Sequence, residues 1–481
     1  IGMENHPLEE ILERKWEEYK TKVKEGGNAQ KIYQEEVWPI LLQLWKERPK
    51  VIPAPKKFDI SIHTLGTSPE ATILAILGTQ ADEIYILHTP ETKAFIAKLE
   101  NETDKKTYPI EVGKSDVAAI YNEVIKILEK NPDKWVALDL TSGTKAMSSG
   151  LGAAGFFFRR FFDKLRVVYV DNDLYDVEVR RPKAGSERMV ILQSPHEVLA
   201  DVDLLLALEH YEKGDYISAQ RYFLQAREKT GSKKYEIYED ISLMYAFWYN
   251  LNFQKAYKKS VQIIEKLNDE KHSKHLKILN YNYLFEQSEL LKHMNEFIET
   301  ENYKNKIGVI GLSETLLKLS KEASKNEELA LSALYSYRAL ELLLQHRIHE
   351  LDKPIETEKI PSQELEMLKQ KLSTLLNQPP DSIKFKPKLG LLELVVYLSI
   401  LNDDAVKEVF DQESIKKLCW NLEARNASLL IHGLKTPSER ENERLQEKAE
   451  KLAKTIKKSE DVSFSVEALK IDKGILRFEE L

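Results

Sequence analysis

Two stretches of the 481-residue chain combine small residues, hydroxyl groups and the start of a helix, which are the components of a phosphate-binding loop. The stretches are Gly66-Thr67-Ser68-Pro69 and Thr141-Ser142-Gly143-Thr144-Lys145. Either one alone is also explained as a tight strand-to-helix turn capped by Ser or Thr. The presence of two such loops, with the positive charge of Lys145 in one of them, favours ligand binding. Neither is a Gly-x-Gly-x-x-Gly fingerprint or a P-loop, which disfavours a nicotinamide oxidoreductase.

A second candidate site lies near the C-terminus, where an arginine and a histidine occupy positions at which an apolar pattern predicts leucine. The pattern is a helical stripe formed by Ile415, Leu418, Leu422 and Leu429. Arg425 falls within this stripe and His432 one step beyond it, roughly 10 Å further along the axis. Because arginine is rarely buried without a partner, this face lines a polar cleft or meets a second copy of itself. Alternatively, Arg425 reaches solvent along its aliphatic stem and His432 ends the helix before Gly433.

The two loops are predicted to lie at one edge of a parallel sheet. Apolar runs at 58–62, 83–87, 108–112, 135–140 and 167–170 alternate with helical patterns, which indicates a doubly wound, Rossmann-like fold. In such sheets, ligands bind beyond the carboxyl ends of the strands, where the strand order reverses. A meander through 177–179 and 190–192 is predicted to close this domain, and the proline-containing stretch 51–57 is interpreted as a linker leading into it.

The rest of the chain is predicted to be helical, so the fold class is α/β plus all-α in several domains. We expect an N-terminal helical segment at 3–50, the Rossmann-like domain at 51–195, helical hairpins at 196–325 and a second helical domain at 326–460. The tail at 461–481 alternates weakly and suggests a short hairpin. The first helix of the 326–460 domain carries Arg338 and Glu341 one turn apart, as a surface pair or as polar support for a site.

Composition excludes several classes of protein. The net charge of −7 and the mixed-sign clusters argue against a large basic surface, so any contact with RNA is expected to be local. No stretch approaches the roughly 20 apolar residues of a membrane span, and no signal-peptide pattern is present. The single cysteine, Cys419, rules out an intrachain disulfide and fits the core of a cytoplasmic protein.

Histidine pairs are the other residues that suggest metal chemistry. The two His-x-x-His pairs, His272/His275 and His346/His349, lack a third ligand at suitable spacing, so both are interpreted as helix-surface histidines and no metal is expected.

At this point the sequence resembles a known family. The segments Leu-Gly-Thr-Ser-Pro (65–69) and Asp-Leu-Thr-Ser-Gly-Thr-Lys-Ala-Met (139–147) together resemble the CARF domain, the CRISPR-associated Rossmann fold. Arg425-Asn426…His432-Gly433 resembles the HEPN ribonuclease motif, and residues 337–341 are similar to the first HEPN helix. The order CARF, helical linker, HEPN matches the auxiliary ribonucleases of type III CRISPR systems. The chain departs from many members at Ser142, where they have a second glycine.

This resemblance implies a single-stranded RNA endoribonuclease that works as a homodimer and is activated by cyclic tetra- or hexa-adenylate, with no cofactor. Its ligand-binding residues would be Gly66, Thr67, Ser68, Pro69, Thr141, Ser142, Gly143, Thr144, Lys145 and Met147. His432 would act as general acid or base, Arg425 would hold the scissile phosphate, and Asn426 would orient phosphate or imidazole. Arg338 and Glu341 would support this site, and the ribose 2′-OH would be the nucleophile.

Two alternatives remain open at the level of sequence. The CARF loops themselves could cleave the ring, with Thr67, Ser68 and Lys145 as catalytic residues and the helical part as a scaffold. The chain could instead be a receptor whose helical half docks a protein partner and has no nuclease activity.

Overall fold

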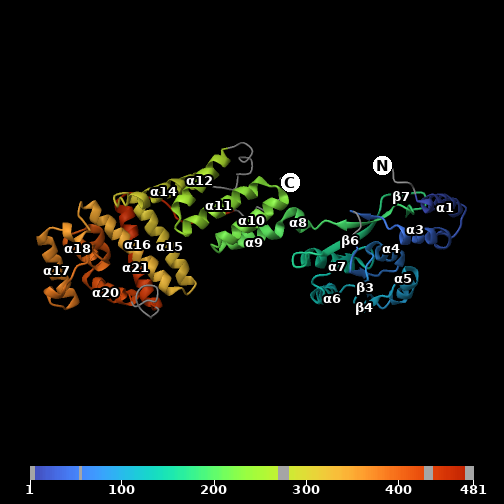
Figure 1. Cartoon of the computed structure of the whole chain (residues 1–481), viewed down its shortest axis with the longest axis horizontal. Helices are drawn as coiled ribbons and strands as arrows, with labels where there is room; N and C mark the ends of the chain where they lie inside the picture. The colour runs from blue at the N-terminus through green and yellow to red at the C-terminus, as the bar shows by residue number, and fades with distance from the viewer. Residues whose placement is uncertain (1–5, 54–56, 269–280, 427–436, 472–481) are drawn as a thin grey trace. The chain divides into compact units, whose positions relative to one another are not determined.

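The computed structural model describes residues 6–53, 57–268, 281–426 and 437–471. The chain forms two compact units, Ile1–Ala200 and Asp201–Leu481 (Figure 1). Within the described ranges, no helix has the length and apolar character needed to cross a membrane.

The first unit is built on a seven-stranded sheet with the order β1-β9-β6-β5-β2-β3-β4. The strands are β1 Val51–Ile52, β2 Ile60–Thr64, β3 Glu83–His88, β4 Tyr108–Glu111, β5 Val136–Asp139, β6 Leu165–Asn172 and β9 Glu187–Leu192. Neighbouring strands are parallel except for β6 and β9. The predicted Rossmann-like sheet is therefore confirmed, and its order reverses on either side of the β2–β5 pair.

Two sequence interpretations in this unit are wrong. The stretch 51–57 is not wholly a linker, because Val51 and Ile52 form β1 and pair with Met189 and Val190 at the sheet edge. The predicted strand at 177–179 is a turn between the short strands β7 Tyr175–Asp176 and β8 Arg181–Pro182. The second half of the predicted meander, 190–192, does lie in a strand, β9.

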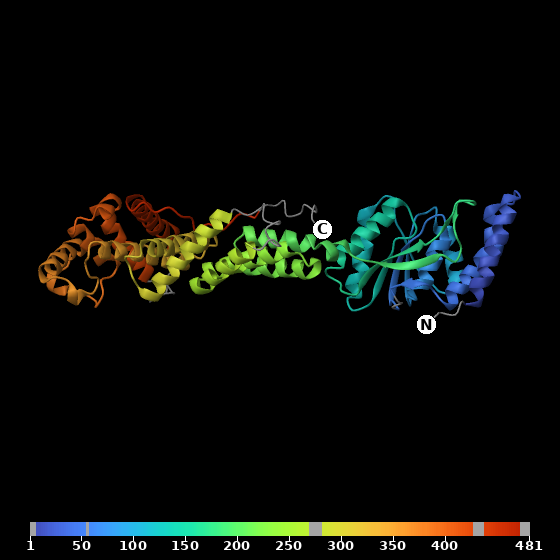
Figure 2. The ribbon, with the colours of Figure 1, turned by 90° about the horizontal axis from the view of Figure 1, so that it is seen from above.

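Helices cover both faces of the sheet. On one face, α4 (Pro69–Thr79) and α5 (Ile96–Thr103) share a hydrophobic core with the N-terminal helices α1 (Pro7–Lys24) and α3 (Trp38–Glu47). On the other, α6 (Val117–Lys130) and α7 (Lys145–Phe158) form a second core. Figure 2 shows the dark blue N-terminal helices on one side of the unit and the teal α7 on the other. The N-terminal segment is thus a layer of this unit.

The second unit is all-helical among its described residues, as predicted. Its first helices, each packed against the next, are α9 Asp201–Glu212, α10 Tyr216–Thr230, α11 Lys233–Tyr249, α12 Phe253–Leu267 and α14 Tyr281–Thr300 (Figure 1). The remaining helices are α15 Lys306–Lys325, α16 Leu329–Glu350, α17 Ser362–Leu376, α18 Leu391–Ile400, α19 Asp404–Val409, α20 Gln412–Asn426 and α21 Glu439–Ser459. α15 packs extensively on α16, and both pack on α21.

The chain after α21 returns along the first helices of this unit. Its described part, up to Ile471, is extended and forms no strand, so the short hairpin suggested by the alternating pattern is not formed there. We call residues 463–471 the C-terminal strap. Val466, Leu469 and Ile471 of the strap are buried.

Candidate functional site

The two loops singled out in the sequence lie next to each other at the carboxyl edge of the sheet. One follows β2 and the other follows β5, and these strands are hydrogen-bonded neighbours in parallel register. Each loop leads directly into a helix, α4 or α7. Because the strand order reverses at this pair, the loops flank the crevice in which doubly wound proteins bind ligands.

Direct contacts hold the two loops together. The Gly66 amide donates to Ser142 Oγ at 3.0 Å, and Thr64 Oγ1 donates to the Ser142 carbonyl. A Cβ on Gly66 would lie 2.9 Å from the Gly143 nitrogen. Gly143 has a φ of 96°, and a Cβ there would lie 2.9 Å from the Thr64 Cβ. Both glycines are therefore required for the loops to approach this closely.

In the second loop, residues 141–145, most hydroxyl groups form hydrogen bonds with neighbouring protein groups. Thr141 Oγ1 donates to Asp139 and accepts from the Val170 amide at 2.9 Å. Thr144 Oγ1 donates to the Lys114 carbonyl at 2.6 Å and accepts from the Met147 amide at 3.2 Å, which caps α7. The structure thus gives Thr141, Ser142 and Thr144 internal partners, where the sequence suggested ligand contacts.

Three of the predicted residues remain available to a ligand. Thr67, Ser68 and Lys145 are exposed, and within the described part of the chain their side chains form no hydrogen bond or ion pair. Ser68 is the N-cap residue of α4 but makes no side-chain capping bond. Pro69 and Met147 are buried and pack. The two loops therefore offer two exposed hydroxyls and one ammonium group beside the starts of two helices, which suits phosphate and ribose oxygens.

A buried polar pair that sequence reasoning missed lies beneath the loops. Asp139 Oδ2 is 2.8 Å from His63 Nδ1, and both side chains are fully buried. His63 Nε2 lies 2.8 Å from Ser61 Oγ, while Asp139 Oδ1 accepts from the Thr141 amide at 3.0 Å. The sequence signal was the alternation of Ser61 and His63 with apolar residues in a fully buried strand. This pair anchors the second loop to β2.

A charged pair stands beside the second loop. Lys114, whose carbonyl accepts from Thr144, also places its ammonium 2.9 Å from Glu91 Oε1. The hydrogen bond from Lys114 lowers the pKa of the Glu91 carboxyl to about 2. Glu91 therefore stays charged near neutrality and offsets the Lys114 charge, so Lys145 is the unpaired cation of these loops as described.

In the second unit, only part of the predicted arginine–histidine site is described. Ile415 and Leu418 are buried on α20, as the stripe predicted, and Arg425 and Asn426 form the last residues of that helix. The side chains of Arg425 and Asn426, and the whole of His432, lie outside the described residues. Cys419 is half-buried and its Sγ lies 3.4 Å from the Ile415 carbonyl.

The proposed support pair lies on α16, which packs against α20. Arg338 Nη1 forms an ion pair with Glu341 and lies 3.5 Å from Gln345 Oε1. The Arg338 side chain is 43% exposed and that of Glu341 18%. The structure therefore brings Arg338 and Glu341 together as a surface-facing pair.

His346 corrects the interpretation of the histidine pairs, because it is fully buried. Its Nδ1 lies 2.7 Å from the Tyr303 carbonyl and its Nε2 lies 2.9 Å from Glu460 Oε1. Burial raises the pKa of Glu460, but the hydrogen bond from His346 and the His346 and Arg347 charges outweigh burial, and the net pKa is lowered. Among the described residues, no three His, Cys, Asp or Glu side chains gather as a metal site. His272 and His275 lie outside the described residues.

Comparison with known proteins gives the family. Residues 199–297 match the family model of the Csm6 6H domain, and residues 299–456 match that of the Csm6 HEPN domain. The "CRISPR system endoribonuclease Csm6" of Thermus thermophilus is 47% identical over 429 residues, which cover 89% of this chain and 92% of that protein. The chain belongs to the Csm6 family of CRISPR system endoribonucleases.

The match to the Csm6 HEPN model begins at residue 299, whereas the sequence pattern had suggested a start at residue 326. It includes α15, which the prediction had placed in the helical linker.

Among solved structures, Enterococcus italicus Csm6 bound to cyclic hexa-2′-fluoro-hexa-dAMP is 12% identical with a TM-score of 0.47, covering 83% of this chain and 94% of that one. Can2 from Sulfobacillus thermosulfidooxidans in complex with cyclic tetra-adenylate is 17% identical with a TM-score of 0.21, covering 37% of this chain and 50% of that one.

Proposed function

We propose that this Csm6 family member is a cofactor-free, metal-independent endoribonuclease that cuts single-stranded RNA in type III CRISPR defence and is activated by cyclic tetra- or hexa-adenylate. The observation that carries the ligand class is the pair of adjoining loops at the carboxyl ends of β2 and β5. These loops lead into α4 and α7, and Thr67, Ser68 and Lys145 are left exposed without internal partners among the described residues.

The working unit in this proposal is a homodimer. A two-fold axis beside the crevices would present two copies of Thr67, Ser68 and Lys145 to one ring. A ring of four or six identical nucleotides has the matching symmetry, so both chains would make equal contacts with it. Gly66, Gly143 and Ser142 would shape the crevice, and Thr141 and Thr144 would hold its second loop.

The nuclease chemistry is assigned to Arg425, Asn426 and His432. The 2′-oxygen of a ribose attacks the adjacent phosphorus as the bond to the 5′-oxygen breaks, leaving a 2′,3′-cyclic phosphate and a 5′-hydroxyl. His432 takes the proton from the nucleophile or gives one to the leaving oxygen, since imidazole exchanges protons near neutral pH. Arg425 stabilises the charge that develops on the phosphate, and Asn426 orients phosphate or imidazole. One histidine per chain favours a composite site built from two chains.

The test is cleavage of a fluorescent single-stranded RNA by purified protein, with chelator present, titrated separately with cyclic tetra- and hexa-adenylate. Stimulation by one ring supports the proposal and identifies the ring size. The fate of the labelled ring is followed in parallel. Ring cleavage without RNA cleavage would favour a ring nuclease, and ring binding without either reaction would favour a non-catalytic receptor. Absence of ring binding would overturn the assignment of the loops.

The matched variant is His432→Ala. We expect RNA cleavage to fall by at least about 100-fold, because the proton-transfer group is lost, while ring affinity stays within about twofold of the unmodified chain. Undiminished cleavage by this variant would show that His432 is not an active-site residue.

A further inference from the structure

Several hydrogen bonds hold the C-terminal strap through its backbone. Tyr249 Oη donates to the Val466 carbonyl at 2.7 Å, and Tyr211 Oη donates to the Leu469 carbonyl at 2.7 Å. The Leu469 amide donates to Tyr245 Oη at 2.8 Å. Since these bonds use main-chain atoms of the strap, the helices recognise an extended peptide backbone.

A second set of contacts fixes the middle of the strap. Tyr283 Oη and Gln287 Nε2 donate to the Glu467 carbonyl at 2.6 and 2.7 Å. Gln287 is itself fixed, because its Oε1 accepts from Tyr245 Oη. The tyrosine and glutamine side chains that bind the backbone of the strap therefore come from three helices, α9, α11 and α14, which together form one groove.

The groove is aromatic beneath the hydrogen bonds. Tyr211, Tyr216, Tyr245 and Tyr249 contact one another with ring centroids 5.1–6.2 Å apart. Burial raises the pKa of Tyr211, Tyr245 and Tyr249, so their hydroxyls stay protonated and able to donate. Val466, Leu469 and Ile471 supply the buried apolar side chains of the strap, while Glu467 and Lys470 are exposed.

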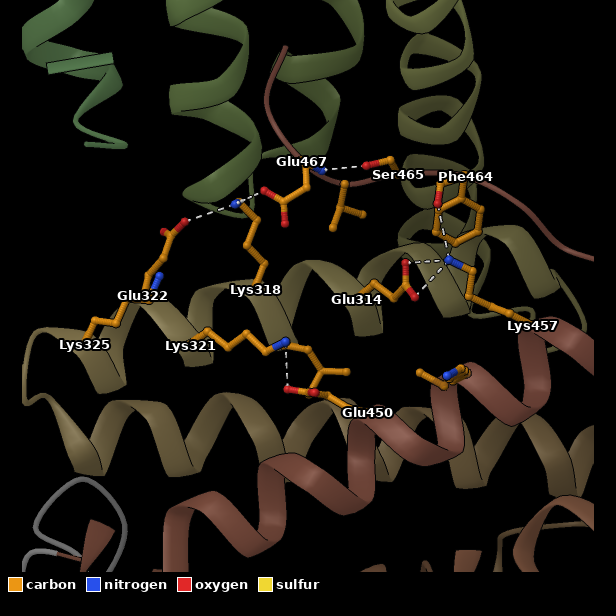
Figure 3. A pocket seen from close by; sticks show the side chains of 14 residues that line it. Glu314, Lys318, Lys321, Glu322, Lys325, Glu450, Lys457, Phe464, Ser465 and Glu467 are labelled. Carbon is orange, nitrogen blue, oxygen red and sulfur yellow. Dashed lines mark hydrogen bonds and ion pairs between the residues drawn. The ribbon is translucent and has the colours of Figure 1, made fainter. Parts of the chain in front are cut away.

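Contacts at Phe464 and Glu467 join the strap to the HEPN helices, as Figure 3 shows. Lys318 of α15 lies 2.6 Å from Glu467, and Lys457 of α21 lies 3.0 Å from Glu314 and over the ring of Phe464. Cavities of about 570 and 1210 Å³ border the strap, so its edges are accessible to solvent.

The position of the strap in the chain gives these contacts a consequence. The strap follows the last residues of the HEPN match, 299–456, yet it is seated on helices of the 6H match, 199–297. The 6H and HEPN helices are therefore connected twice, once where α14 leads to α15 and once through the strap. A movement of α9, α11 or α14 against the HEPN helices has to carry the strap with it or release it.

We propose that α9, α11 and α14 form a peptide-binding groove whose occupant is the chain's own segment 463–471, and that the seated strap transmits ring binding to the nuclease domain. This inference rests on the proposed function for its activation step, while the groove and its occupant are independent of it.

The decisive experiment compares two truncations of the full chain. A chain ending at Val462 lacks the strap, and a matched control ending at Ile471 keeps it. We expect the shorter chain to bind the activating ring within about twofold of the control, and its ring-stimulated RNA cleavage to fall at least about tenfold. A synthetic peptide of sequence Ser-Phe-Ser-Val-Glu-Ala-Leu-Lys-Ile, added in trans, should restore cleavage. The same peptide with aspartate in place of Val466 and Leu469 should not.

The outcomes separate the two proposals. If the Ile471 control is not stimulated by either ring, the proposed function fails, and anisotropy of the fluorescent peptide on the shorter chain still tests the groove. If the control is stimulated and the shorter chain is stimulated equally, or if the peptide does not bind, the strap proposal is overturned.

Full-length variants cover the case in which the shorter chain does not fold. We expect Tyr211→Phe combined with Tyr249→Phe to lower ring-stimulated cleavage at least about threefold at unchanged ring affinity. Tyr235→Phe, which removes a buried tyrosine hydroxyl at the other end of α11, should leave cleavage unchanged. Equal behaviour of the double variant and the Tyr235 control would contradict the proposal.

Discussion

The crevice loops of the first unit and the strap groove of the second both use hydroxyl groups to hold irregular backbone, but they differ in what is left over. In the groove, tyrosine hydroxyls from separate helices bond to the carbonyls of Val466 and Leu469. In the crevice, the loops bond to each other and leave Thr67, Ser68 and Lys145 without partners in the described structure. The buried tyrosine hydroxyls of the groove are satisfied by the strap, as buried polar groups nearly always are. The exposed groups of the loops are free to bind the proposed ligand.

The strongest way to break this comparison is to separate the two loops with Gly143→Ala. The added Cβ would combine a φ of 96° with a 2.9 Å contact to Thr64, which forces the loops apart. We expect ring affinity, measured by calorimetry, to fall about 100-fold, equivalent to about 2.7 kcal/mol. Gly26→Ala is the matched control, because Gly26 has a φ of 93° but nothing within 4 Å of the added Cβ. If both substitutions leave ring affinity intact, close approach of the loops is not needed.

A smaller effect is expected from Lys145→Ala, which removes the unpaired cation of the crevice loops as described. Ring affinity should fall roughly tenfold, or about 1.4 kcal/mol, and its dependence on salt should weaken because one phosphate contact is lost. Lys130→Ala, at an exposed position near the end of α6, is the control. Equal affinities and salt dependences for the two variants would show that Lys145 does not face the ligand.

The hydrogen bonds of the groove are tested by measuring the free energy of unfolding. Tyr249→Phe removes the donor to the Val466 carbonyl and should lower the free energy of unfolding by about 1–2 kcal/mol in a urea titration. Tyr235→Phe on the same helix should cost less than about 0.5 kcal/mol. A cost for Tyr235→Phe as large as that for Tyr249→Phe would mean that the strap contact contributes nothing specific.

The smallest expected effect is on stability, at the N-cap residues of α7 and α4. Thr144 makes a capping hydrogen bond and Ser68 makes none. Thr144 Oγ1 caps α7, so Thr144→Ala should lower the unfolding free energy by about 1 kcal/mol. Ser68 makes no capping bond, so Ser68→Ala should cost less than about 0.5 kcal/mol while still weakening ring binding. The reverse order of stability would show that Ser68, rather than Thr144, is structural.

The sequence predicted those features that depend on local pattern. The alternation of strands and helices predicted the Rossmann-like sheet, and the carboxyl ends of β2 and β5 lie together because parallel strands share an edge. It did not predict which hydroxyls are used internally, since the Ser142 bond to Gly66 joins residues 76 positions apart. The buried His63–Asp139 pair likewise depends on strand register, which alternation alone does not specify.

The helical half was predicted less completely for the same reason. The apolar stripe containing Ile415 and Leu418 correctly predicted α20, because helical periodicity is a local property of the sequence. The burial of His346 depends on Glu460, 114 residues away, and the contact between the strap and Tyr283 spans 184 positions. Two-residue β1 and the turn at 177–179 are too short for a periodic signal.

The shared core of the N-terminal helices and the sheet determines where the first unit can be cut from the rest of the chain, for example to test it alone for binding of the proposed ring. A fragment that begins at Val51 would lack Trp16, Trp38 and Trp45, and the residues of α4 and the sheet that share their hydrophobic core would be exposed, which promotes aggregation. A fragment made for that test should therefore retain the helices from Pro7 onward.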